Sequence, residues 1–159
     1  MAGETYGKVQ TTFQLLTEET AIKWSFNFDA DATQTAPDTW NAGDIMTFDG
    51  ATTGEVQQAT VSSLQALGVA METYTTSLNE TANGKVTVIV GPHIGKTKQI
   101  DSSITTSLVP GTLLYPSNVT AGRFGTAGAT GAKPVAMALD YDGTWLTYLW
   151  LGEFVTVQA

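Results

Sequence analysis

The fold of this chain is decided by residues Gly111–Trp150, which read GTLLYPSNVTAGRFGTAGATGAKPVAMALDYDGTWLTYLW. Glycine turns separate short apolar segments here, and a similar order of elements occurs earlier, in residues Gly43–Val90. Each stretch passes through a Gly turn, an apolar pair, a second Gly turn, a Val-Ala-Met strand, an Asn-Gly or Asp-Gly turn and a last apolar strand. An internal repeat of this kind predicts two related copies of one small β-unit.

The spacing between the two stretches is nearly constant. It is 68 positions from Gly43 to Gly111 and 66 positions from Val69 to Val135. The second stretch has no counterpart of residues 75–82. The alternative is that β-proteins reuse the same turn and strand patterns without a common origin. The same order of turns and strands in both stretches favours duplication over that alternative.

The rest of the chain also favours strands. Thr, Val, Ile and aromatic residues are strand formers, and the 16 glycines suit turns. We expect an N-terminal β-hairpin in which residues 9–16 pair with residues 20–28 through the turn at 17–19. The predicted fold is mainly β with little helix, as two related sandwich-like or barrel-like units in tandem. The predicted division is residues 1–40 as an N-terminal arm, 41–91 as the first unit, 92–106 as a connector and 107–159 as the second unit.

Composition limits the classes of function. The net charge is −8, from 7 basic and 15 acidic residues, and the basic residues are scattered. Nucleic-acid binding needs clustered cations, and an anionic membrane surface repels an acidic chain, so neither partner is predicted. There is no cysteine, and residues Met1–Thr5 lack the features of a secretory signal. We therefore expect synthesis in the cytoplasm of a host cell.

Three motifs resemble functional sites, and none has the required spacing. In residues 86–97, Gly-Lys-Thr follows an apolar strand. A phosphate-binding loop needs four residues between its first Gly and Gly-Lys, and only three separate Gly91 from Gly95. Residues 29–33 begin like a calcium loop, but Gln34 stands where the loop needs Gly, and Trp40 where it needs Glu. His93 is the single histidine, so no multi-histidine metal site exists. No catalytic, cofactor-binding or metal-binding residue is predicted, and the chain is not expected to be an enzyme.

The second stretch resembles a known family. The segments PGTLLY at 110–115, PVAMALD at 134–140 and WLTYLWL at 145–151 are similar to the small β-domains of tailed-phage capsid decoration proteins, also called cement proteins. The resemblance covers about a third of the chain, and the first copy covers another third more weakly. It implies a virion structural protein on the outer surface of the capsid. Its partners would be the major capsid protein and itself, as a homo-oligomer that is a trimer in typical members. The tandem duplication departs from the single-domain pattern.

The last strand of the second copy is apolar on both faces. Because strand residues alternate, Leu146, Tyr148 and Trp150 share one side. A strand with two apolar faces is either central in a core or pressed against another subunit. We expect these three residues to form a subunit or capsid interface, with a doubly covered core strand as the alternative. The alternative function is another virion surface module, such as a head fibre base, a tail component or a carbohydrate-binding domain.

Overall fold

The computed structural model describes residues 12–17, 19–28, 39–49, 54–75 and 85–151, and within them it contains strands and turns but no helix. The expectation of a mainly β fold is confirmed. The strands are β1 Phe13–Leu15, β2 Ile22–Phe28, β3 Thr39–Trp40, β4 Ile45–Phe48, β5 Glu55–Gln58, β6 Gly68–Ala70, β7 Tyr74–Thr75, β8 Lys85–Val90, β9 His93–Thr97, β10 Leu113–Pro116, β11 Phe124–Gly125, β12 Ala136–Tyr141 and β13 Leu146–Trp150. No helix in the described residues is long and apolar enough to cross a membrane.

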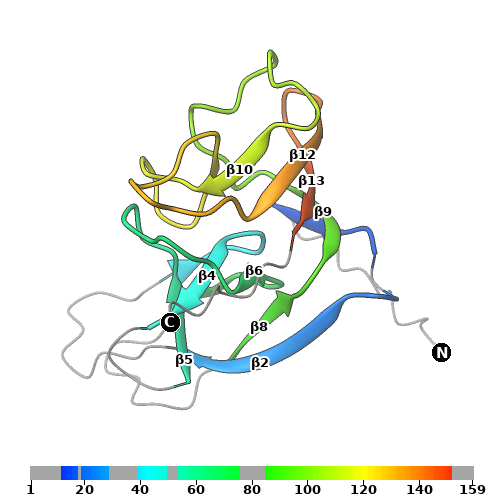
Figure 1. Ribbon diagram of the computed structural model, residues 1–159. Coiled ribbons are helices and arrows are strands. Elements are labelled where there is room, and N and C mark those ends of the chain that lie inside the picture. Colours follow the sequence, from blue (N-terminus) through cyan, green and yellow to red (C-terminus); the bar gives the residue numbers. More distant parts are fainter. Residues whose placement is uncertain (1–11, 18, 29–38, 50–53, 76–84, 152–159) are drawn as a thin grey trace.

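The first half of the fold is a closed barrel in the order β2-β5-β4-β6-β8 (Figure 1, lower part). Its longest contact joins β2 to β8 over six consecutive antiparallel pairs. Alternate residues of β8 point inward, so Val86, Val88 and Val90 enter the barrel core. Met46 of β4 and Val56 of β5 complete that core from the facing strands.

The second half is a six-stranded sheet in the order β1-β9-β13-β12-β10-β11 (Figure 1, upper part). A parallel bridge between Ile100 and Phe124 brings the chain just after β9 beside β11 at the far edge. The sheet therefore curls back on itself. Its core includes Leu114, Phe124 and Tyr148, each fully buried.

The two halves share strand order and register. The order β5-β4-β6-β8 in the barrel recurs as β11-β10-β12-β13 in the sheet, with antiparallel neighbours throughout. Ile45 pairs with Val69 in the first half, and Leu113 pairs with Met137 in the second. Leu113 lies 68 positions after Ile45, and Met137 lies 68 positions after Val69. The structure thus matches Val69 with Met137, and the sequence match of Val69 with Val135 was displaced by two residues.

The last strand of each half keeps its pairing but shifts in number. Gly68 pairs with Val90, and Ala136 pairs with Trp150. The spacing falls from 68 positions at Gly68 to 60 at Val90, because the second half lacks a counterpart of residues 75–82. Hydrophobic side chains of both halves nevertheless form one continuous cluster. Independent tandem units therefore stay a prediction, although the order and register repeat.

The structure differs from the sequence expectation at one connection and adds a strand at another. Within the described residues the expected N-terminal hairpin is absent, since β1 pairs with β9, and β2 pairs with β8 and β5 in the barrel. A seven-residue strand gains more from six pairs with β8, whose valines it helps to enclose, than from a three-residue neighbour. The predicted connector at 92–106 contains β9, which pairs with β13 as β2 pairs with β8. Each half therefore includes a strand outside the sequence match, β2 beside β8 and β9 beside β13.

Candidate interaction surface

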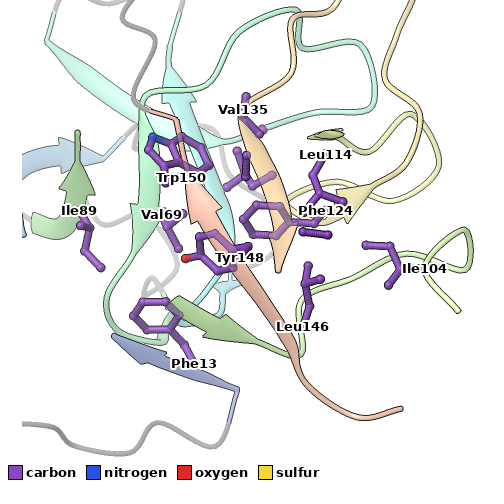
Figure 2. Packing of buried hydrophobic residues seen from close by; sticks show 14 of the residues in the cluster. Phe13, Val69, Ile89, Ile104, Leu114, Phe124, Val135, Leu146, Tyr148 and Trp150 are labelled. Atoms are coloured by element: carbon purple, nitrogen blue, oxygen red, sulfur yellow. The ribbon is translucent and has the colours of Figure 1, made fainter. Parts of the chain in front are cut away.

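The predicted interface residues of β13 lie in the core. Leu146 and Tyr148 have no exposed surface, and Trp150 is 2% exposed. β13 runs between β12 and β9, and these side chains point into the cluster that contains Phe124 (Figure 2). Their burial within one chain agrees with the alternative of a covered core strand. A contact of β13 with another subunit stays a prediction that could involve only the opposite face, where Leu149 is half-buried.

His93 is buried beside this aromatic group. Its Nδ1 lies 3.0 Å from the carbonyl oxygen of Gly91, and its Nε2 lies 3.1 Å from the hydroxyl of Tyr148. A neutral ring satisfies both contacts, because Nδ1–H donates to the carbonyl and Nε2 accepts from the phenol. Burial lowers the pKa of His93 from 6.5 to about 4. The ring is stacked on Trp150 with centroids 5.9 Å apart. The described contacts make His93 a neutral core residue.

A second buried ionisable group lies where the two halves meet. Asp44 has no exposed surface, and its Oδ2 accepts hydrogen bonds of 2.7 Å from the backbone N–H of Asn41 and from Nε2 of Gln58. Its Oδ1 has no hydrogen-bond partner among the described residues. Burial raises the pKa of Asp44 from 3.8 to about 6, against the opposing hydrogen bonds and the charge of Arg123. Asp44 was not among the site residues predicted from the sequence, although a carboxylate at the start of an apolar strand was a visible signal.

His93 and Asp44 predict opposite pH dependences. The folded pKa of His93 is lowered, so its contribution to stability is present above pH 6.5 and is lost as the pH falls towards 4. The folded pKa of Asp44 is raised, so its contribution is present below pH 3.8 and is lost as the pH rises towards 6. Between pH 4 and 6 the two contributions nearly cancel in the wild-type protein.

Substitution should separate them. In His93→Gln the free energy of unfolding should fall, relative to wild type, as the pH rises from 4 to 6. In Asp44→Asn it should fall as the pH drops over the same range. In each variant the free energy of unfolding should change by roughly 3 kcal/mol over this pH range, since one pKa unit corresponds to about 1.4 kcal/mol. Urea unfolding followed by tryptophan fluorescence at several pH values measures both. Two variants that keep the wild-type profile would show that neither group is perturbed by folding.

The remaining polar clusters are explained by local structure. Asp101 accepts hydrogen bonds from the backbone N–H of Ser103 (2.8 Å) and from the hydroxyls of Ser103 and Ser117, which fixes the loops around β11. The resemblance to a phosphate-binding loop ends in β9, a strand and not a helix. The calcium-like residues 29–33 lie outside the described residues. Within the described part of the chain, no group of three His, Cys, Asp or Glu side chains could hold a metal ion.

Large apolar side chains are exposed on both halves. On β2, Ile22 is 60% exposed and Trp24 is 63% exposed, although both lie on the same side as the buried valines of β8. Apolar and polar residues alternate along β2, and the structure leaves part of its apolar face uncovered. The other exposed large apolar residues in the described part are Leu16, Phe48, Val61, Leu64, Val109, Leu113 and Val119. These side chains form the apolar part of the described surface that a partner protein can contact.

Comparison with protein-family models, curated proteins and solved structures gave no match.

Proposed function

We propose that this chain is a virion structural protein that decorates the outer surface of a capsid and stabilises contacts between major capsid subunits. The proposal starts from the resemblance of residues 110–151 to capsid decoration domains. It is supported by an all-β fold in which the strand order of that region is repeated in the preceding half. Its partners would be the major capsid protein and further copies of the chain.

The observation that carries the proposal is the exposed apolar surface. Trp24, Val109 and Val119 are each more than 60% exposed, while only 14% of the residues in the chain are charged. Exposed apolar side chains bind protein surfaces by excluding water, and such contacts need few ion pairs. A protein that binds the assembled shell, and not free subunits, stabilises assembly by mass action.

This chemistry predicts binding that is weakly dependent on salt. Purified protein should sediment with expanded, undecorated capsids. Raising the salt from about 0.1 to 0.5 M should change the bound fraction less than about threefold, because screening weakens ion pairs and leaves apolar contacts intact. Sedimentation without capsids is the control. Absence of co-sedimentation would contradict the proposal, and complete release at moderate salt would indicate an electrostatic clamp instead.

One observation favours the alternative of a carbohydrate-binding virion module. Trp24 is the most exposed of the four tryptophans, since Trp40 and Trp150 are buried and Trp145 is half-buried. An exposed indole can stack on a sugar ring. Retention on a glycan column that Trp24→Ala abolishes would support this alternative. If neither the wild type nor Trp24→Ala is retained on the glycan column, and the wild type binds capsids, decoration would be supported.

A further inference from the structure

A row of apolar side chains crosses the outer face of the second half. Leu113 of β10 pairs with Met137 of β12, which pairs with Leu149 of β13. Directly opposed residues of an antiparallel sheet point to the same side, so the three form one continuous row. Leu113 is 43% exposed, and the other two are half-buried. We call Leu113, Met137 and Leu149 the outer row.

The first half contains an equivalent row, and there it is covered. Ile45, Val69 and Ile89 pair across β4, β6 and β8 in the same register as the outer row. All three have no exposed surface and belong to the cluster that contains Leu114 and Phe124 of the second half (Figure 2). The contact between the two halves of the chain is therefore made by the first copy of this row.

A backbone seam runs beside that contact. The N–H of Ile45 donates to the carbonyl oxygen of Gly122 (2.8 Å), and the N–H of Gly122 donates to the carbonyl oxygen of Ala59 (2.7 Å). Gly122 precedes β11, so the start of β11 is part of what covers the first row. A Cβ at Gly122 would lie 2.7 Å from Cγ of Gln58, which shows how closely the two halves approach.

The residue that corresponds to Gly122 in the first half is uncovered. Gly54 lies 68 positions earlier, also has a positive φ, and a Cβ built on it meets nothing within 4 Å. Phe48, whose strand pairs with β5, is 47% exposed and makes an edge contact with Phe26 at 5.8 Å. We call Phe26, Phe48 and Gly54 the β5 end. The chain thus exposes the second copy of the row, and it also exposes the equivalent of Gly122 beside the apolar side chain of Phe48.

We propose that the outer row of one copy docks against the β5 end of a second copy, and so repeats between chains the contact that joins the two halves within one chain. Such an interface is head-to-tail: each copy presents a different surface, and assembly continues until a ring closes or a filament grows. This inference goes beyond the proposed function and needs no capsid.

The first test measures mass in solution. Sedimentation velocity of the full chain from about 1 to 200 µM should show species larger than a monomer. Leu113→Glu should raise the dissociation constant at least about 100-fold, because a carboxylate would be buried within the contact. Val61→Glu is the matched control, since Val61 is also 43% exposed and lies outside both surfaces. A monomeric wild type, or equal losses in Leu113→Glu and Val61→Glu, would overturn the proposal.

The second test distinguishes head-to-tail docking from a symmetric contact of row on row. Phe48→Glu should also be monomeric alone, because it lacks the other surface. A mixture of Leu113→Glu and Phe48→Glu should form a dimer and nothing larger, since one intact copy of each surface remains. That dimer also demonstrates that both variants are folded. If Phe48→Glu assembles like wild type, or if the mixture stays monomeric, docking of the outer row on the β5 end is wrong.

Discussion

Replacing Trp150 by alanine should lower the free energy of unfolding by about 3–5 kcal/mol, the range for removing a large aromatic side chain from a core. Trp150 is 2% exposed, is stacked on His93 and makes an edge contact with Phe124 at 6.2 Å. No smaller side chain fills the space between these rings, so a cavity would remain and the neighbouring residues would lose contacts. Urea unfolding followed by circular dichroism at neutral pH measures the loss.

Concentration separates this core role from an interface role. The destabilisation should be the same at low and high protein concentration, since the contacts lie within one chain. Trp145→Ala is the matched control: Trp145 is half-buried, with Nζ of Lys98 4.7 Å from its ring centre, and its loss should cost less than about 1.5 kcal/mol. If Trp150→Ala kept the stability of the wild type and formed smaller oligomers, β13 would be part of a subunit interface, as its sequence suggested.

Replacing Gly122 by alanine should cost about 2–4 kcal/mol, for two separable reasons. Its φ of +71° is unfavourable for any residue with a Cβ, which accounts for about 1 kcal/mol. The new methyl group would also lie 2.8 Å from Cδ of Gln58, whose amide donates to the buried carboxylate of Asp44. Moving Gln58 would remove a hydrogen bond from a carboxylate whose Oδ1 has no partner in the described part of the chain.

The repeat supplies the control for this substitution. Gly54 has a φ of +84° and open space around its Cβ position, so Gly54→Ala should show the backbone cost of about 1 kcal/mol alone. The excess in Gly122→Ala should shrink when Gln58 is also replaced by alanine, which a double-mutant cycle of unfolding free energies measures. Equal costs at Gly122 and Gly54 would show that the junction between the halves tolerates the methyl group.

The first row and the start of β11 join the halves through apolar contacts and backbone hydrogen bonds, and Asp44 is buried at the same junction. A substitution there should therefore affect both halves in one unfolding transition. The outer row and Gly54 are the equivalents of this junction that stay uncovered, and in the proposed assembly they would join one chain to the next.

The amino-acid sequence by itself determined the properties that depend on local pattern. Strand formers with glycine turns predicted a mainly β fold, and the spacing of Gly43 from Gly111 located strands that share order and register. Both are visible in sequence because turn chemistry and side-chain alternation act over a few neighbouring residues. The sequence also showed that the second half has no counterpart of residues 75–82, which accounts for the change in spacing at the last strand of each half.

Tertiary structure alone decided everything that depends on partners distant in the chain. β1 and β2 are adjacent in sequence but pair with β9 and β8, since a strand takes the partner that buries most apolar surface, however far away. The two apolar faces of β13 could not be told apart, because the same pattern serves a core and an interface. Likewise Ile45 is buried and Leu113 is exposed at equivalent positions, and only the packing of one half on the other distinguishes them.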